Sequence, residues 1–317
     1  MSAQATPRWS VVVPTYNRPA RLAECVAALT RLLAPEGGFE IVVVNDGGME
    51  PPDTLRAAAP GNAVGVRFIS QPNAGAGEAR NHGAKVARGE WLAFTDDDCA
   101  PVPDWLLRLE EALKHEPGAL VGGPVRNALT GNLFCEASQR LAEYAATYFD
   151  GNQARERFFT SNNIAVAKAA FLEAGGFDTR FGRGAAEDRE FTDRWYAQGR
   201  PSARVPGAEV RHSHELSLRT FLKQHHSYGK GAHNFRAVRR ESGRPVRIDL
   251  PFYAGSLSNA KEGGGLRGLA LAGLTVAAHG AYLTGLALAT LRRRKLDGAA
   301  TAHPSNRATE SLSKGAS

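Results

Sequence analysis

The chain has 317 residues, of which 43% are hydrophobic and 22% are charged. This size allows one large hydrophobic core and argues against intrinsic disorder. Cys25, Cys99 and Cys135 are isolated and odd in number, which argues against a disulfide framework and a closed zinc site and indicates a reducing, cytoplasmic compartment. The N-terminus has no apolar stretch before Trp9, so we expect no secretory signal.

The formal net charge of +7 is unevenly distributed. Residues 1–218 carry slightly more acidic than basic side chains, whereas 219–247 and 292–317 are strongly basic. An enzyme that binds nucleic acid would spread Lys and Arg over its functional face. We therefore expect no nucleic-acid partner, and the pattern favours a basic region close to an anionic membrane surface.

The first hundred residues alternate between predicted strands and helices. In chain order these are a strand at 9–14, a helix with Leu22, Cys25, Val26 and Leu29 at helical spacing, strands at 39–44 and 64–69, a helix at about 77–87, and a strand at 91–94. This alternation predicts a parallel sheet covered on both faces. Polar residues at the carboxyl ends of its strands are then site candidates.

After Asp98 the alternation fades into elements that we expect to bind an acceptor. They are a helix at about 104–114, a loop around 122–124 and a helix at about 134–148. A helix at 189–198 and a strand at 204–214 follow further along the chain. The next segment places Phe221, Leu222, His225, Tyr228, Ala232 and Phe235 at intervals of three or four residues, with Arg and Lys between them. That spacing predicts a basic amphipathic helix.

Residues 268–291 contain no charged side chain and are followed by Arg292-Arg293-Arg294-Lys295. At about 1.5 Å per residue the segment is long enough for a bilayer core of roughly 30 Å. Three interpretations stay open: a membrane span, a re-entrant or interfacial hairpin broken at His279-Gly280, and a helix packed on the protein itself. A span with its Arg-rich end in the cytoplasm would place the catalytic body outside, so the positive-inside tendency conflicts with the missing secretory signal. This conflict is resolved if the basic stretch at 219–247 stays inside and the tail is translocated.

The predicted organisation has five parts. They are a disordered N-terminus at 1–8, a catalytic domain at 9–218, a basic amphipathic helix with its connector at 219–262, an apolar membrane-associated or transmembrane segment at 266–291, and a basic disordered tail at 292–317.

Asp96, Asp97 and Asp98 follow the strand at 91–94. Clustered carboxylates repel one another, and a hard divalent cation such as Mg²⁺ or Mn²⁺ relieves the repulsion while keeping positions open for substrate phosphates. The alternative is an acidic loop that caps the next helix. Position favours the cation site, because Asp46 ends another strand and both loops face one crevice.

The loop at 73–81 has the spacing of a dinucleotide fingerprint, but Arg80 replaces its third glycine. We therefore reject a Rossmann oxidoreductase.

Taken in order, these motifs resemble the family 2 glycosyltransferases over about residues 9–230. The matching pieces are Val-Val-Val-Pro-Thr-Tyr-Asn-Arg at 11–18, Val-Val-Asn-Asp-Gly at 43–47, Asn-Ala-Gly with Ala-Arg-Asn-His-Gly within 73–83, Phe-Thr-Asp-Asp-Asp at 94–98, Ser-Asn-Asn-Ile-Ala-Val at 161–166, Gly-Gly-Phe-Asp at 175–178, and Glu187-Asp188. The resemblance implies an α/β fold, the α/β/α sandwich of the glycosyltransferase A type, here with a C-terminal helical, apolar extension.

The resemblance also implies roles on the donor side of the site. Pro14 and Tyr16 would shape the nucleotide pocket, and Asp46 would accept hydrogen bonds from a pyrimidine base. Arg80 would contact base or ribose. Alternatively, Tyr16 is loop packing and Arg80 is an exposed helix residue paired with Glu78 or Asp46.

In the acidic loop, the resemblance places Asp97 near the ribose and the metal and makes Asp98 a metal ligand. Asp96 is the third donor-side carboxylate. Mn²⁺ or Mg²⁺ would neutralise charge on the leaving nucleotide diphosphate.

Sugar transfer also needs a general base for the acceptor hydroxyl. Asp188 is the candidate, because the family pattern places its base at the second residue of this pair. Glu187 is the alternative. The usual Gly before the pair is Ala186 here. Either carboxylate would equally serve as a plain helix N-cap.

His212 and His214 point to one face if the strand at 204–214 is extended. One of them is a candidate metal or phosphate ligand, and the sequence leaves the choice between them open.

The resulting hypothesis is an inverting, metal-dependent glycosyltransferase. It would move a sugar from a nucleotide-diphosphate donor to a glycan or lipid-linked acceptor at the cytoplasmic face of the cell membrane, in the synthesis of cell-envelope polysaccharide or glycolipid. Two alternatives remain: a nucleotidyltransferase of the same fold type, and a catalytically silent sugar-nucleotide-binding membrane protein.

Overall fold

The computed structural model describes residues 6–51, 55, 65–151, 158–244, 246, 249–262 and 264–301. The strands are β1 Trp9–Thr15, β2 Phe39–Asn45, β3 Gly65–Ser70, β4 Trp91–Phe94, β5 Cys99–Pro101, β6 Leu120–Gly122, β7 Val125–Asn127, β8 Ile164–Ala167, β9 Ser202–Arg204 and β10 Val210–His212. The helices are α1 Pro19–Leu29, α3 Ala76–Val86, α4 Trp105–His115, α5 Leu133–Gly151, α6 Lys168–Glu173, α7 Glu187–Ala197, α8 Leu218–Glu241, α9 Leu250–Ala260 and α10 Gly265–Thr301, with a short 3-10 turn at Thr179–Phe181.

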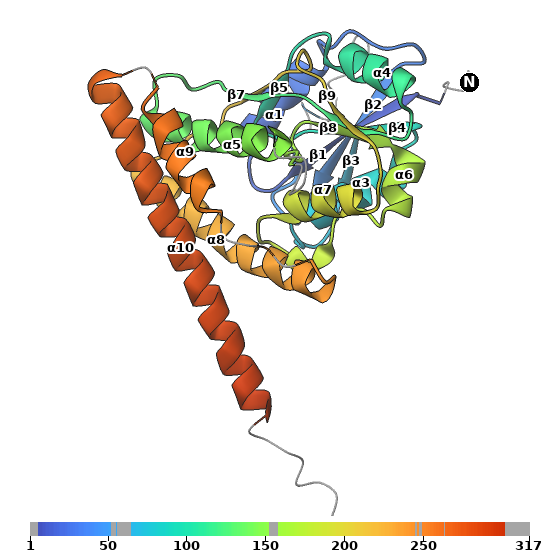
Figure 1. Cartoon of the computed structure of the whole chain (residues 1–317). Helices are drawn as coiled ribbons and strands as arrows, with labels where there is room; N and C mark the ends of the chain where they lie inside the picture. The colour runs from blue at the N-terminus through green and yellow to red at the C-terminus, as the bar shows by residue number, and fades with distance from the viewer. Residues whose placement is uncertain are drawn as a thin grey trace, which may run out of the picture.

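A seven-stranded sheet in the order β3-β2-β1-β4-β8-β6-β9 forms the centre of the fold (Figure 1). The strands from β3 to β4 are mutually parallel, and β8 is antiparallel to both of its neighbours. Every residue of β1, β2 and β4 is buried, as the apolar runs in these strands predict for a sheet covered on both faces. The predicted α/β sandwich is confirmed.

A second, three-stranded sheet has the order β5-β10-β7. The predicted single strand at 204–214 is therefore wrong. Arg204 ends β9 in the central sheet, and β10 begins at Val210 in the other sheet. Pro206 and Gly207 interrupt the extended pattern between them.

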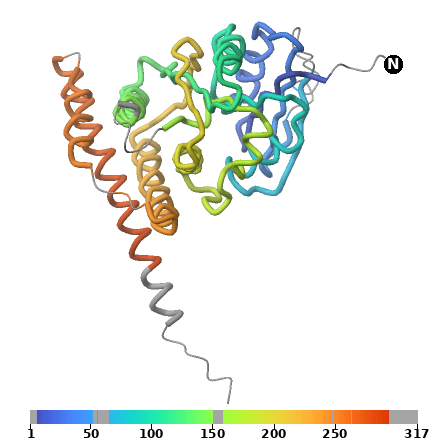
Figure 2. Tube along the Cα trace, turned by 45° about the vertical axis from the view of Figure 1, so that its right-hand side comes forward, coloured from blue at the N-terminus to red at the C-terminus, as the bar shows by residue number. Residues whose placement is uncertain are grey.

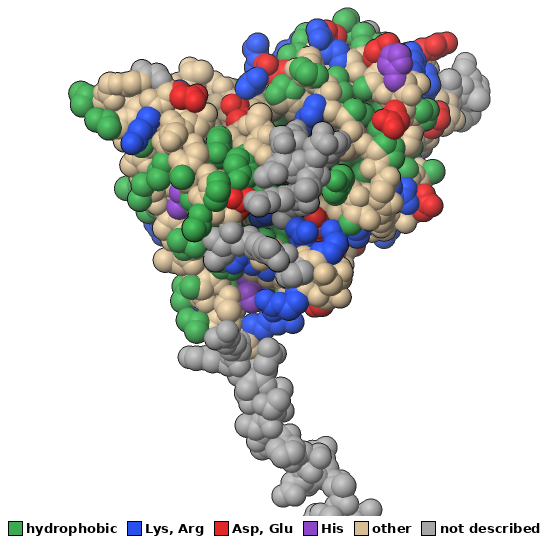
Figure 3. All heavy atoms as spheres, viewed as in Figure 1, with side chains coloured by type: hydrophobic (Ala, Val, Ile, Leu, Met, Phe, Trp, Pro, Cys, Tyr) green, Lys and Arg blue, Asp and Glu red, His purple; other side chains and the backbone are tan. Residues whose placement is uncertain are grey.

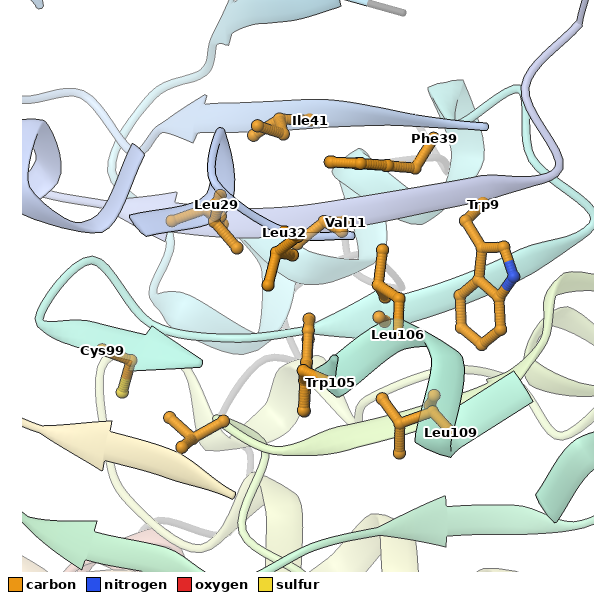
Figure 4. Packing of buried hydrophobic residues seen from close by; sticks show 14 of the residues in the cluster. Trp9, Val11, Leu29, Leu32, Phe39, Ile41, Cys99, Trp105, Leu106 and Leu109 are labelled. Atoms are coloured by element: carbon orange, nitrogen blue, oxygen red, sulfur yellow. The ribbon is translucent and has the colours of Figure 1, made fainter. Parts of the chain in front are cut away.

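Hydrophobic cores fill both faces of the central sheet. Figure 4 shows the first, where Trp9 and Phe39 from the strands pack with Leu29 of α1 and with Trp105 and Leu109 of α4. On the other face the aromatic rings of Phe94, Phe171, Phe177, Phe191 and Trp195 form a continuous cluster. These two cores fix the strand ends from which the candidate site is built.

The C-terminal helices form a layer beside this domain. Figures 1 and 2 both show α10 running alongside α8, with α5 and α9 near one end. α10 is continuous through His279-Gly280, so of the three open interpretations the hairpin is wrong. The Leu and Ala residues around Gly280 have high helix propensity, which outweighs the cost of one glycine, about 1 kcal/mol.

Both predicted disordered ends need correction where the structure describes them. The Arg8 backbone N–H donates to the Gly37 carbonyl at 3.1 Å, and its guanidinium pairs with Glu110 at 3.0 Å. Arg8 therefore belongs to the folded domain. Residues 292–301 continue α10 as helix. The rest of the predicted tail, 302–317, and residues 1–5 lie outside the described residues.

Close contact between α8 and α10 depends on two glycines. A Cβ built on Gly229 would lie 1.9 Å from the Tyr282 carbonyl oxygen, and one built on Gly285 would lie 2.0 Å from the His226 carbonyl oxygen. The backbones of the two helices therefore touch here, as helix crossings with small residues allow.

We expect Gly229→Ala to destabilise the protein by about 2 to 3 kcal/mol, because the added methyl group must push the helices apart. Gly280→Ala is the matched control, since a Cβ there meets no atom within 4 Å. It should be neutral or stabilising by up to about 1 kcal/mol. Thermal melts of both variants measure the difference, and equal melting temperatures would contradict a glycine-dependent crossing.

Candidate active site

The acidic loop lies between β4 and β5, at the edge where the parallel strands end. β4 ends at Phe94, the loop contains Asp96 to Asp98, and β5 begins at Cys99. β5 pairs antiparallel with β10, and Cys99 lies opposite His212. This register brings a histidine from far along the chain to the side of Asp98.

Asp98 and both candidate histidines form one cluster. The Asp98 carboxylate lies 3.2 Å from Nε2 of His212 and 3.3 Å from Nδ1 of His214. One ligand atom from each residue lies within 4.8 Å of the others. A carboxylate oxygen and two imidazole nitrogens converging at this distance fit a divalent cation, with other coordination positions left for phosphate oxygens.

The protonation states in this cluster follow from burial and pairing. Burial raises the pKa of Asp98, but hydrogen bonds from His212 and His214 outweigh it and hold that pKa well below its usual range. Burial lowers the pKa of His212, but the Asp98 carboxylate reverses this and raises the pKa above its ordinary value. Asp98 is therefore ionised at neutral pH and available as a ligand.

Asp97 is held by Thr15, which the sequence places at the same crevice, and by Arg18, whose part in the site the sequence does not indicate. It accepts a hydrogen bond from Thr15 Oγ1 at 2.7 Å and one from Arg18 at 3.2 Å. Arg18 also donates to Asp98 at 3.0 Å. Burial, partly offset by the Thr15 hydrogen bond, raises the pKa of Asp97 to about 6. The sequence feature that could have identified Arg18 as a site residue is its place in the loop that carries Tyr16.

Asp46 organises the neighbouring loop. Its two carboxylate oxygens accept hydrogen bonds, each 2.8 Å long, from the Gln71 side chain and from the backbone N–H groups of Ala74 and Gly75. Pro14 is buried in β1, whereas Tyr16 is 48% exposed just beyond it. Base binding by Asp46 and pocket formation by Tyr16 stay predictions.

Arg80 is buried and bridges two parts of the candidate site. Its guanidinium donates to Asp96 at 2.5 Å and to Glu187 at 3.1 Å. The alternative of an exposed Arg80 paired with Glu78 or Asp46 is therefore wrong. The ion pairs connect the acidic loop to the start of α7. Contact of Arg80 with a base or ribose stays a prediction.

Asp188 lies in the first turn of α7, next to the segment that precedes β8. One carboxylate oxygen accepts from the Arg189 N–H at 2.7 Å and the other from the Ser161 N–H at 3.4 Å. Neither Asp188 nor Glu187 is the N-cap, because Ala186 occupies that position. Burial and the neighbouring Glu187 charge raise the pKa of Asp188 well above its usual range, as a general base working near neutral pH requires.

Ala186 has backbone φ of 83°, in the left-handed region that favours glycine. Such strain in a residue with a Cβ costs on the order of 1 kcal/mol. We expect Ala186→Gly to stabilise the protein by about 0.5 to 1 kcal/mol, measured by urea unfolding. Ala185→Gly is the control, because Ala185 lacks a positive φ and should lose stability. A destabilised Ala186→Gly variant would contradict the strain.

A cavity of about 780 Å³ lies between α3, α6, α7 and the end of α8. None of the candidate residues lines it. A small pocket of about 20 Å³ adjoins the cluster and is lined by His212, His214 and Gln224, among others. The larger cavity is therefore separate from the acidic loop and from Asp188.

A mostly parallel α/β sandwich with an acidic loop at the strand ends defines the class of nucleotide-sugar transferases with the glycosyltransferase A type fold. The family model "Glycosyl transferase family 2" matches residues 10–174. The chain therefore belongs to glycosyl transferase family 2.

Curated relatives carry glycosyltransferase names. The chain is 28% identical over 250 residues to validoxylamine A glucosyltransferase of Streptomyces hygroscopicus subsp. limoneus, covering 68% of this chain and 55% of that protein. It is 31% identical over 181 residues to glucosyl-dolichyl phosphate glucuronosyltransferase of Haloferax volcanii, covering 55% of this chain and 57% of that protein. The chain thus spans little more than half the length of these relatives.

Solved structures agree on the fold. A mannosyltransferase from Pyrobaculum calidifontis, solved with GDP-Man and Mn²⁺, superposes with a TM-score of 0.56 at 19% identity and covers 93% of this chain and 86% of its own. GalNAc-T7, solved with UDP, GalNAc and Mn²⁺, gives a TM-score of 0.52 at 15% identity and covers 80% of this chain and 55% of its own.

Proposed function

We propose that the protein is a metal-dependent, inverting glycosyltransferase that uses a nucleotide-diphosphate sugar as donor. The observation that supports this most directly is the contrast between two carboxylates. The Asp98 carboxylate lies 3.2 Å and 3.3 Å from the imidazoles of His212 and His214, which lower its pKa. Asp188 accepts hydrogen bonds from two backbone N–H groups, and burial raises its pKa. Carboxylates whose environments push their pKa values apart are typical of sites that divide ligand and proton-transfer roles.

On the donor side, Asp98, His212 and His214 would hold Mn²⁺ or Mg²⁺. When bound, the cation supplies neutralisation of the negative charge that develops on the leaving nucleotide diphosphate. Exposed Tyr16 would line the nucleotide, with Pro14, Asp46, Arg80, Asp96 and Asp97 forming the rest of the donor pocket.

On the acceptor side, Asp188 removes the proton from the attacking hydroxyl group. The acceptor oxygen then bonds to the anomeric carbon as the bond from that carbon to the diphosphate oxygen breaks. One base and a single displacement invert the anomeric configuration. Glu187, paired with Arg80, holds its charge away from the proton transfer and is the weaker candidate for the base.

Asn162 lies between these two sides of the site. Its Nδ2 donates to Cys99 Sγ, and its neighbour Ser161 donates to Asp188. Within the described part of the chain, Asn162 Oδ1 is buried and has no hydrogen-bond partner. A buried acceptor without a partner is costly, so a sugar hydroxyl donating to this oxygen is the natural complement.

For the acceptor, a glycan or lipid-linked molecule used in cell-envelope synthesis is our proposal, with the enzyme at the cytoplasmic face of the membrane. The support is the apolar helix α10. Among the described residues, the segment Gly265–Arg293 of α10 is the one helical stretch long and apolar enough to cross a membrane.

Thermal-shift measurements with a panel of nucleotide sugars, each with and without Mn²⁺, identify the donor, because binding stabilises the folded state. Transfer is then followed by the released product. Release of nucleoside diphosphate and an inverted anomeric centre is the expected result. Release of pyrophosphate would identify the nucleotidyltransferase alternative, retention would exclude the single displacement, and donor binding without turnover would indicate the silent binding protein.

A further inference from the structure

The outward face of α10 is an apolar surface along most of the helix. Leu269, Val276 and Leu283 recur every seven residues and are 63%, 57% and 51% exposed. Residues 268–291 include no charged side chain. Figure 3 shows hydrophobic side chains along this edge of the molecule. Large exposed apolar surfaces of this kind mark contact with a partner or a membrane.

The inward face of α10 is attached to the protein over the same length. His226 and His233 of α8 lie 3.4 Å and 3.0 Å from the hydroxyls of Thr284 and Thr290. Ser256 of α9 lies 2.9 Å from His279 Nε2. Leu271, Thr275 and Ala278 are buried in between. α10 therefore has one covered side and one free side.

α8 in turn is fixed to the catalytic domain. A Cβ on Gly231 would lie 2.2 Å from the Ala185 carbonyl oxygen, next to the candidate base. Arg239 and Arg244 lie 3.6 Å and 2.9 Å from the Asp193 carboxylate of α7. A membrane-spanning α10 would either leave α8 or draw the charged residues of α8 and part of the catalytic domain into hydrocarbon, where charge is costly.

Basic residues lie beside the apolar surface. Lys223 and Lys230 are exposed and lie within three or four residues of His226, on the side of α8 that reaches α10. Residues at such spacing are neighbours on a helix. Arg292 and Arg293 follow the apolar segment at its end and are also exposed. An apolar strip flanked by cations is complementary to a membrane with anionic headgroups.

We propose that α10 docks lengthwise on an anionic membrane surface, with Leu269, Val276 and Leu283 inserted at the headgroup boundary and Lys223 and Lys230 contacting lipid phosphates. The helix lies in the membrane plane and does not cross the bilayer. Docking itself does not depend on the proposed function. Its consequence rests on that function, and is that a lipid-linked acceptor would reach Asp188 along the membrane surface.

Flotation of the full chain with vesicles tests the docking. We expect binding to phosphatidylcholine mixed with phosphatidylglycerol, weaker binding to phosphatidylcholine alone, and a decrease at high salt. Val276→Asp with Leu283→Asp should lower binding at least about tenfold, and Lys223→Gln with Lys230→Gln should lower it about fivefold per lysine. Leu172→Asp is the matched control, because Leu172 is 44% exposed on α6, away from α10. It should bind like the parent protein.

The depth of single tryptophans introduced at 269, 276 and 283 separates docking from spanning. These positions share one face and cover about 21 Å along the helix axis. Quenching by brominated lipids, corrected for the parent protein, should report the same shallow depth at all three. Depths that differ by about 10 Å between successive positions would show a crossing helix and overturn the proposal.

Absence of vesicle binding, or unchanged binding of the Val276→Asp and Leu283→Asp variant, would also overturn it. A stable dimer that the double variant dissociates, without vesicle binding, would assign the surface to a second copy instead. Donor hydrolysis in solution keeps this result separate from the proposed function. The double variant should hydrolyse the donor like the parent, whereas failure of the proposed function would abolish hydrolysis in both proteins.

Discussion

Replacing Asp98 with Asn should abolish metal-dependent turnover, lowering kcat at least about a thousandfold. The neutral amide removes the negative charge that pairs with His212 and His214 and that we propose binds the cation. Several kcal/mol of charge stabilisation in the transition state depend on such an ion, and each 1.36 kcal/mol corresponds to about tenfold in rate. Steady-state kinetics across a Mn²⁺ titration measure the loss.

Two controls make the Asp98 result interpretable. Asp104→Asn changes a carboxylate at the start of α4, where its partner is Arg108, and should leave kcat unchanged. Circular dichroism checks that Asp98→Asn still folds, since the substitution also removes the ion pair with Arg18. Full activity of the parent protein in excess chelator would show that the cluster is structural and that the metal role is wrong.

Replacing Asp188 with Asn should lower kcat by about a hundredfold to ten-thousandfold, the range typical of general-base catalysis. The KM for the donor should change little, because Asp188 lies on the acceptor side in the proposed site. Glu187→Gln is the comparison. It disturbs the ion pair with Arg80 and should alter donor binding more than the proton-transfer step. A larger kcat loss in Glu187→Gln would reverse the assignment of the base.

The raised pKa of Asp188 also predicts two dependences on pH. Activity should fall as pH decreases through that pKa, because the protonated carboxyl group accepts no proton. Stability changes in the opposite sense. The fold binds this proton more tightly than the unfolded chain does, so the stabilisation from Asp188 is present at acid pH and is lost as pH rises through the raised pKa.

Asp188→Asn should therefore melt higher than the parent protein at alkaline pH and about equally at acid pH. Melts across the pH range check this. A variant that is less stable at alkaline pH would show that the carboxylate is held by favourable interactions and is not poised as a base.

The parts of the fold that sequence reasoning reached are local. The buried runs in β1, β2 and β4 and the polar residues that end them follow from periodicity, which predicts Asp46 and Asp98 at strand ends. The family motifs added the order of these pieces. The sequence indicates α10 as an apolar segment, but its packing alongside α8 depends on Gly229 and Gly285. The sequence around these two glycines does not distinguish them from other helical glycines.

The missed features are contacts between distant segments. The pairing of Arg80 with Glu187 joins residues 107 positions apart and requires α3 and α7 to meet over the aromatic core. His212 and His214 are predicted as candidate ligands, but the second sheet that brings β10 beside Asp98 is not. Arg18 lies in a matching motif of the first loop, but spacing along the chain does not show that its side chain pairs with Asp97 and Asp98.

Arg80 has a consequence for the evolution and engineering of donor choice. One guanidinium pairs with Asp96, on the proposed donor side, and with Glu187, the neighbour of the proposed base, so both sides of the proposed site depend on one side chain. A substitution at Asp96 would remove one ion pair of Arg80 and leave its pair with Glu187, at the start of α7. We therefore expect positions 96 and 187 to tolerate change only as a pair, and specificity to be altered with less penalty from Tyr16, which is exposed and lies outside these ion pairs among the described residues.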